Sequence, residues 1–265
     1  MVEVSILMAT RNGEKHIREA IESLLNQTFY DFELIICNDH STDKTVEIIT
    51  SYMKLDNRIN LIHNMKKPGL TTTLNIGLEK CKGKYVARMD DDDIAHKDRI
   101  EKEYVFMENN SSIAVVGSDI NYFDQNGVYG VSNFTREPDK IDIWKDDIFA
   151  NPTAMIRTDV IKQIGNYDES DDVIRIEDYD YWCKLYANGF KGVNLKEVLL
   201  DYREDNNAFK KRNNIRRIRL VRRMNYWSNP MGIQGMVKGR MLYELAKCMV
   251  PQKAIQIYHR ITYKK

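Results

Sequence analysis

Residues 74–93 read LNIGLEKCKGKYVARMDDDD and pass from a helical pattern into a short strand that ends in four acids. The segment from Leu70 to Cys81 reads as a helix, and Lys82-Gly83 closes it. Tyr85 to Met89 is an apolar run with the length of a buried strand. Folding gives no reason for four consecutive carboxylates after such a strand, so the run Asp90–Asp93 indicates a functional site.

The same alternation of helices and strands extends back to the start of the sequence. Three more apolar runs are predicted to be strands: Val4–Met8, Glu33–Cys37 and Ile59–Ile62. Helices are predicted around Ile17, Ile21, Leu24 and Leu25 and over Thr45–Met53. This alternation predicts a parallel sheet with right-handed crossovers, in which ligands lie beyond the carboxyl ends of the strands. From about Ile113 to Tyr202 the pattern changes to shorter strands and turns.

The composition is that of a folded chain. Hydrophobic residues make up 43% and charged residues 30% of the 265 positions, which excludes a disordered protein. No apolar run approaches the ~20 residues of a membrane-spanning helix, and the first residues lack the basic region and cleavage site of a signal peptide. The four cysteines are scattered without C-x-x-C spacing. We therefore expect a cytoplasmic protein with reduced thiols.

The net charge of +1 hides a strong asymmetry. Residues 203–265 contain 16 lysines and arginines and three acids, so the rest of the chain is acidic. A basic amphipathic helix opens this tail, with Ile215, Ile218, Val221 and Met224 recurring among Lys211, Arg212, Arg216, Arg217, Arg219, Arg222 and Arg223. Such a helix is typical of an anionic membrane surface, and we expect residues 210–227 to bind the inner membrane face. The open alternative is a basic face packed against the acidic body.

The acid run after the strand suits a divalent cation. Hard Mg²⁺ or Mn²⁺ prefers carboxylate oxygens and bridges them to substrate phosphates. A solvated acidic turn, or a set of caps ahead of a helix over Ile94–Met107, is the alternative explanation. The position after a strand in an α/β pattern favours the metal site.

Polar residues that suit a nucleotide follow two other predicted strands. Asp39, in Asn38-Asp39-His40-Ser41, could accept the imino hydrogen of a uracil, although an Asx turn would also explain it. The segment Ala9-Thr10-Arg11-Asn12-Gly13 combines a hydroxyl, a guanidinium and backbone amides. The glycine patterns of a dinucleotide site and of a P-loop are absent.

Four segments, in order over residues 4–203, resemble the family 2 glycosyltransferases: VSILMATRN, NQTFYDFELIICNDHSTD, LNIGLEKCKGKYVARMDDDD and IEDYDYWCKL. The resemblance implies an inverting enzyme of the α/β GT-A fold that uses a nucleotide-sugar donor. A mostly parallel, Rossmann-like nucleotide-binding half over 1–110 would merge with an acceptor-binding half over 111–203. A basic helical extension would follow over 204–265.

The resemblance also implies roles for individual residues. Donor binding falls to Ala9, Thr10, Arg11, Asn12, Asp39 and Asp91, the metal to Asp90 and Asp92, base catalysis to Asp178, and the acceptor to Glu177 and Trp182. Asp92 would be the direct Mn²⁺ or Mg²⁺ ligand, and Asp90 or Asp91 would lie near the ribose. Glu177 and Asp178 are also explained as first-turn acids of a helix, and Trp182 as a packing residue.

Four features of the sequence depart from the family pattern. Asn151-Pro152-Thr153 resembles the family's His-Pro-Thr segment, with Asn in place of His. Arg11 stands where the family usually has Tyr, so a guanidinium would stack on the base. Asp205 stands where relatives often carry His, which leaves an additional metal ligand open. The Q-x-x-R-W signature of processive relatives is absent, which favours a single transfer.

We therefore expect transfer of one sugar from a UDP-hexose or UDP-N-acetylhexosamine to a glycan or lipid-linked acceptor in bacterial surface polysaccharide synthesis. A sugar nucleotidyltransferase is an alternative that would share paired acids and a metal, but it usually brings a Gly-rich basic loop. A nucleic-acid-binding protein is a second alternative. The acidic body and the lack of interleaved aromatic residues in the tail argue against it, so no nucleic-acid partner is expected.

Overall fold

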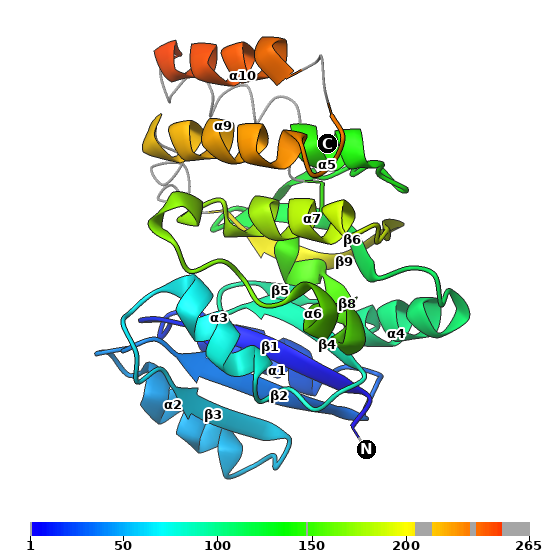
Figure 1. Ribbon diagram of the computed structural model, residues 1–265. Helices are drawn as coiled ribbons and strands as arrows, with labels where there is room; N and C mark the ends of the chain where they lie inside the picture. The colour runs from blue at the N-terminus through cyan, green and yellow to red at the C-terminus, as the bar shows by residue number, and fades with distance from the viewer. Residues whose placement is uncertain (1, 147, 205–213, 234–236, 251–265) are drawn as a thin grey trace.

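The strands join in one mixed sheet of order β3-β2-β1-β4-β8-β6-β9-β5, with β7 paired to β6 (Figure 1). The computed structural model describes residues 2–146, 148–204, 214–233 and 237–250. The strands are β1 (Val4–Thr10), β2 (Phe32–Asn38), β3 (Ile59–His63), β4 (Tyr85–Asp90), β5 (Ile94–Ala95), β6 (Val115–Asp124), β7 (Gly127–Val131), β8 (Met155–Arg157) and β9 (Gly192–Arg203).

Helices cover both faces of this sheet. They are α1 (Ile17–Leu25), α2 (Thr45–Met53), α3 (Leu70–Leu78), α4 (Arg99–Asn109), α5 (Lys140–Lys145), α6 (Thr158–Ile164), α7 (Glu177–Ala187), α9 (Asn214–Ser228) and α10 (Val237–Ala246). Short 3₁₀ turns span Asn151–Thr153, Asp171–Val173 and Lys247–Met249. In the described ranges, no helix combines the length and apolar character needed to cross a bilayer.

Side chains alternate between two cores along the central strands. Ile6, Met8 and Met89 pack with α1, α2 and α4, whereas Leu7 and Val86 pack with α3, α6 and α7. This alternation follows from the two-residue period of a strand, and both faces are apolar because helices cover both. The near-continuous apolar runs in the sequence therefore reflect burial on both sides.

The predicted α/β fold is confirmed. The parallel pairs β1–β2, β1–β4 and β2–β3 form the first half of the sheet. Beyond β4 the sheet is mixed, because β8 runs antiparallel to β4 and β6 runs parallel to β9. The sheet is continuous across position 110, so the division into a donor half and an acceptor half remains a prediction about function.

Two local expectations were wrong. The helix expected over Ile94–Met107 begins only at Arg99, because Ile94 and Ala95 form β5 against β9. The second part of the chain was expected to hold shorter strands, but β6 and β9 span ten and twelve residues. The two strands pair with each other from distant parts of the chain, which local sequence patterns do not encode.

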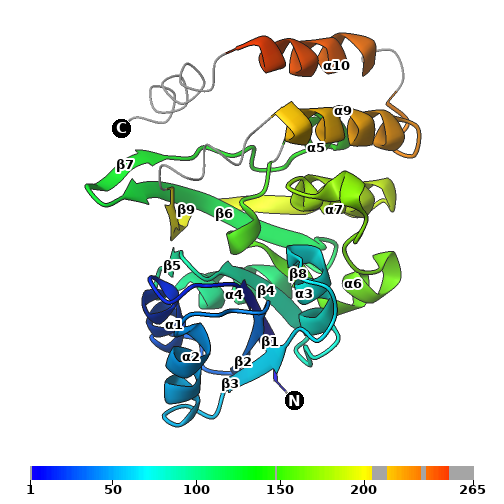
Figure 2. The ribbon, with the colours of Figure 1, turned by 90° about the vertical axis from the view of Figure 1, so that its left-hand side faces the viewer.

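The basic tail packs on the body as successive layers, with α9 over α7 and α10 over α9 (Figures 1 and 2). Val221, Met224 and Trp227 of α9 are buried. Ile215 and Ile218, expected on the same apolar stripe, are 59% and 43% exposed. The stripe is therefore split between the core and the surface. Lys211, Arg212 and the start of the expected membrane segment at 210 lie outside the described residues.

An ion pair inside the core fixes α4 beneath the end of β4. Arg99 Nε donates to Glu103 Oε1 at 2.9 Å, and neither side chain is exposed. The second guanidinium arm of Arg99 donates to the Arg88 carbonyl at 2.7 Å. Removing one partner of such a pair leaves an uncompensated charge in the core.

We expect Glu103→Ala to lower the free energy of unfolding by about 3–5 kcal/mol, because the Arg99 charge would remain buried without its partner. Joint replacement of Arg99 and Glu103 by Met should recover most of this loss. The partly exposed Lys102 provides the control, since Lys102→Ala should cost no more than about 1 kcal/mol. Urea denaturation measures all three, and an unchanged midpoint for Glu103→Ala would contradict the assignment.

Candidate active site

The carboxyl ends of β1, β2 and β4 meet at one edge of the sheet. Ala9 lies opposite both Cys37 and Asp90, and Thr10 lies opposite Asn38. The loops that follow these strands therefore begin side by side, which places the predicted donor residues and the acid run in one region. Parallel strands produce this juxtaposition because their carboxyl ends share an edge.

The loop after β1 packs against the acid turn, which is formed by Asp90–Asp93. The Thr10 hydroxyl, which is buried, donates to the Asp91 carboxylate. A Cβ on Gly13 would lie 2.5 Å from Asp91 Oδ2, so the glycine permits this close approach. Asn12 takes a left-handed conformation at φ 55°, and its Oδ1 accepts the Thr42 N–H at 2.8 Å. The loops after β1 and β2 are thereby tied together.

Asp39 is held from two sides. Its side chain accepts Asn64 Nδ2 at 3.0 Å and the Gly69 N–H at 3.1 Å, and Arg11 NH1 lies 3.7 Å from it. The residue is 5% exposed, whereas the Arg11 side chain is 55% exposed. A carboxylate has about four acceptor positions, so Asp39 retains capacity to accept a further N–H.

Asn64 and Gly69 were missed at the sequence level. Asn64 follows β3, at the same edge as the other strand ends, and its amide also reaches Thr73 Oγ1 at 3.0 Å. A polar residue directly after the third predicted strand was the signal that could have identified it. Gly69 has φ 159° and precedes α3, so its N–H can point at Asp39.

The four acids after β4 occupy different environments. Asp90, Asp91 and Asp92 are partly exposed, whereas Asp93 is fully buried. Asp93 Oδ1 accepts the Arg203 N–H at 2.8 Å. Burial raises the pKa of Asp93 well above its usual range, with Asp92 and Asp90 adding to the effect and the Arg203 N–H opposing it. Asp93 is therefore a structural member of the run.

Arg203 anchors the turn from the end of β9. Its Nε donates to the Asp92 carbonyl at 2.7 Å, and its NH2 reaches Glu19 on α1 at 2.5 Å. The guanidinium carbon lies 4.4 Å from the centre of the Phe123 ring. Sequence reasoning missed this residue because its partners come from three distant segments. Asp205, where an additional metal ligand was left open, lies outside the described residues.

The acid turn offers a partial cation site. Within the described ranges, no three His, Cys, Asp or Glu side chains gather into a metal-binding group. Magnesium sites at phosphates commonly use one or two carboxylates, and water and phosphate oxygens complete the coordination. The partly exposed carboxylates of Asp90 and Asp92, at the edge where Asp39 also lies, fit such a site.

Glu177 and Asp178 are the first two residues of α7 and are partly exposed. Burial raises the pKa of Glu177, against the opposing effects of backbone N–H groups and of the Arg175 and Arg216 charges. The helix N-terminus favours an ionised carboxylate at these positions. Both acids therefore lie at the end of α7 that can stabilise negative charge.

Two other residues of the IEDYDYWCKL segment are structural. Trp182 is 1% exposed and packs against Phe149, with ring centroids 5.4 Å apart. The expected floor for the acceptor is therefore not available at Trp182, because this indole lies in the core. Asp180 accepts the Trp227 indole N–H at 2.6 Å and Arg223 Nε at 2.7 Å, which fastens α9 to α7.

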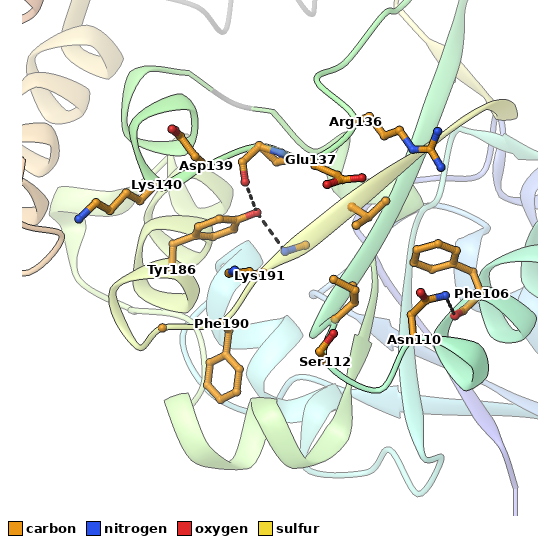
Figure 3. A pocket seen from close by; sticks show the side chains of 15 residues that line it. Phe106, Asn110, Ser112, Arg136, Glu137, Asp139, Lys140, Tyr186, Phe190 and Lys191 are labelled. Atoms are coloured by element: carbon orange, nitrogen blue, oxygen red, sulfur yellow. Dashed lines mark hydrogen bonds between the residues drawn. The ribbon is translucent and has the colours of Figure 1, made fainter.

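A separate hollow of about 620 Å³ lies at the amino ends of β6 and β9 (Figure 3). Its wall includes Arg136, Lys191 and Tyr186, and the Tyr186 hydroxyl donates to the Pro138 carbonyl at 3.1 Å. None of the predicted site residues lines this hollow. It is therefore distinct from the acid edge of the sheet.

Comparison with known sequences identifies relatives over most of the chain. The family model for "Glycosyl transferase family 2" matches residues 5–165. The "Putative glycosyltransferase EpsE" of Bacillus subtilis is 36% identical over 211 residues, which cover 79% of this chain and 76% of the relative. The "O-antigen biosynthesis glycosyltransferase WbnJ" of Escherichia coli is 33% identical over 213 residues, covering 78% and 82%.

Solved structures share the fold. Staphylococcus aureus TarS 1-349, in complex with UDP-GlcNAc, aligns with a TM-score of 0.64 and 19% identity over 95% of this chain and 82% of that one. The mannosyltransferase PcManGT from Pyrobaculum calidifontis, in complex with GDP-Man and Mn2+, aligns with a TM-score of 0.67 and 14% identity over 94% and 70%. The family match over more than half of the sequence and the relatives at 36% and 33% identity show that the chain belongs to glycosyl transferase family 2.

Proposed function

We propose that this glycosyltransferase is an inverting, metal-dependent enzyme that transfers one sugar from a UDP-sugar to a glycan or lipid-linked acceptor in bacterial surface polysaccharide synthesis. The observation that carries the proposal is the meeting of Asp39 and the acid turn at one sheet edge. The name of WbnJ, an O-antigen biosynthesis enzyme, supports the pathway class. The TarS complex with UDP-GlcNAc supports a UDP-sugar.

The donor would lie along the loops after β1 and β2. Asp39 would accept the imino N–H of uracil, and the exposed Arg11 would stack its guanidinium on the base. Ala9, Thr10 and Asn12 would line the ribose and the diphosphate. Thr10 and Gly13 keep this loop against Asp91, so the ribose end of the donor would meet the acid turn.

Asp90 and Asp92 would hold Mn²⁺ or Mg²⁺. A cation bound there would offset the charge that develops on the nucleoside diphosphate as it leaves. The PcManGT complex with Mn2+ supports a metal in a protein of the same fold. Asp91 would contact the donor and would not bind the metal, because its carboxylate accepts the hydrogen bond of the Thr10 hydroxyl in the loop after β1.

Asp178 would act as the base. Inversion requires one in-line displacement, in which a base removes the proton of the acceptor hydroxyl as the new bond forms. Glu177 would contact the acceptor beside it. Trp182 is left out of this proposal, because its side chain is buried.

The surface of α9 would hold the enzyme on the anionic inner face of the membrane. Ile215, Ile218 and Tyr226 are exposed apolar residues on this helix. The Arg222 side chain is 68% exposed, and its NH1 lies 3.7 Å from the similarly accessible Asp172 carboxylate, a surface pair that an anionic headgroup could replace. Arg223 is not available for this contact, because it pairs with Asp168 and Asp180. An exposed apolar strip with cations beside it fits the headgroup region of an anionic leaflet.

The donor assignment is tested by measuring nucleotide release from UDP-glucose, UDP-galactose, their N-acetyl forms and GDP-mannose, each with Mn²⁺ and with Mg²⁺. We expect release from one UDP-sugar. Nucleotide release from GDP-mannose alone would contradict the assignment of Asp39 as the acceptor of the uracil imino N–H. Formation of a nucleotide sugar from a sugar phosphate would instead identify a nucleotidyltransferase.

Asp92→Asn should abolish metal-dependent nucleotide release and leave the fold intact, because a neutral amide relieves repulsion within the acid run. Asp31→Asn, at an exposed acid at the start of β2, provides the control and should behave like the unaltered protein. Thermal melting checks the fold of both. Full activity in excess chelator would contradict a metal requirement.

Asp178→Asn should lower turnover by at least ~10²-fold, the usual lower range for a general base, while the affinity for UDP stays the same. The reason is that the base acts on the acceptor and does not contact the nucleotide. Steady-state rates and UDP titration measure the two quantities. If Glu177→Gln loses turnover and Asp178→Asn does not, the base is Glu177.

Arg222→Gln should weaken binding to vesicles containing anionic lipid several-fold, because one Lys or Arg near such a surface contributes about 1 kcal/mol. Lys196→Gln on β9 removes an equal charge from a residue paired with Asn133 and should leave vesicle binding unchanged. Co-sedimentation at low salt measures both. Failure of the unaltered protein to bind anionic vesicles would show that the tail serves only to pack on the body.

A further inference from the structure

Arg88 carries a full charge inside the apolar strand β4. The residue is 1% exposed, and its NH1 donates to the carbonyls of Leu7 at 2.9 Å and Met89 at 3.2 Å. Its NH2 donates to Asp90 Oδ1 at 2.8 Å. Burying a guanidinium is costly unless charges and hydrogen bonds compensate it. An apolar side chain would fill the same space without this cost, so packing alone does not explain an arginine beside the acid turn.

The strand alternation places Arg88 on the same side of the sheet as α7. Val86, two residues earlier, belongs to the core formed with α3, α6 and α7, whereas Ala87 and Met89 face the opposite core. Side chains two residues apart on a strand share a face. The Arg88 side chain therefore lies on the face of the sheet that α7 covers together with α3 and α6.

Tyr167 connects α7 to this region. Its ring stacks on Tyr181 of α7 with centroids 4.2 Å apart, and its backbone N–H donates to Asn75 Oδ1 of α3 at 3.0 Å. Tyr181 follows Asp178 by three residues, and such pairs lie on one helix face. The stack thus places the Asp178 face of α7 beside Tyr167.

The electrostatics agree with this placement. Burial acts to lower the pKa of Arg88, but Asp90, Tyr167 and Asp178 act against it, and the net direction is upward. Arg88 in turn opposes the rise that burial produces in the pKa of Tyr167. Arg88 therefore lies close enough to interact electrostatically with Asp90 of the acid turn and with Asp178 on α7.

We propose that Arg88 is a positioning residue for two parts of the active site, the acid turn and the proposed base. It holds Asp90 by a direct ion pair and presents a fixed positive charge to Asp178. The inference rests on the proposed role of Asp178 as the base. A charge that is buried and held by backbone carbonyls cannot turn away into solvent. It offsets the negative charge of both carboxylates and limits their mutual repulsion.

A double-mutant cycle between Arg88→Met and Asp178→Asn tests this coupling. Turnover is measured with the UDP-sugar that gives the fastest metal-dependent UDP release. Arg88→Met alone should lower turnover about 10-fold, within the range of coupling between residues of one network. In the Asp178→Asn protein, the same substitution should lower turnover by a clearly smaller factor than in the unaltered protein, because only its effect through Asp90 remains.

Two further variants separate coupling from loss of structure. Arg88→Lys keeps the buried charge and should retain more turnover than Arg88→Met, and it goes through the same cycle in case the Met variant does not fold. Arg157→Met removes another largely buried arginine, whose guanidinium donates to the carbonyls of Ile113 and Met107 at 2.7 Å. It should lower the melting temperature, but its effect on turnover should be the same with and without Asp178.

The outcomes distinguish this inference from the proposed function. If Asp178→Asn is impaired and Arg88→Met lowers turnover by the same factor in both backgrounds, Arg88 acts independently of Asp178 and the coupling is wrong. Unaltered turnover in Arg88→Met would also overturn it. Normal turnover in Asp178→Asn would overturn the proposed base and, with it, the coupling.

Discussion

The crowding of carboxylates at the carboxyl edge of a parallel sheet is the constraint on which the rest of this structure depends. Asp39 and Asp90–Asp93 come together there because their strands, β2 and β4, flank β1 on either side. Each is held by a particular partner: Arg88 pairs with Asp90, and the Arg203 N–H caps the buried Asp93. Without these partners, like charges this close would disfavour ionisation or separate the loops. The site is thus an acidic surface with a cationic and amide support beneath it.

Helix α7 links this edge to the basic tail. Its first turn carries Glu177 and Asp178, and Asp180 of the same turn accepts hydrogen bonds from Arg223 and Trp227 of α9. The charge asymmetry of the sequence is therefore used in part within the molecule, since Arg203, Arg222 and Arg223 of the tail pair with acids of the body. Among the described residues, the exposed strip of α9 remains accessible to an external surface.

Periodicity was a good guide wherever neighbours in sequence are neighbours in space. The strands and helices up to β4 were predicted within a few residues, because each of these strands lies parallel to another strand from the same part of the chain and is covered by the helices between them. Past β4 the prediction failed in detail, because β6 and β9 pair across a long separation. Strand propensity depends on such pairing more than on local sequence. The rule that ligands lie at the carboxyl ends of strands predicted the edge of the sheet at which Asp39 and the acid run come together.

The sequence by itself determined the fold class, the family and the edge of the sheet at which acids gather, because these depend on local period and on motifs within single segments. Only the tertiary structure decided what each residue does there. It buried Asp93 beneath Arg203, a residue 110 positions away, placed Trp182 in the core, and divided the tail stripe between interior and surface. The physical reason is that burial and charge pairing depend on which distant segments become neighbours. Local sequence patterns do not contain that information.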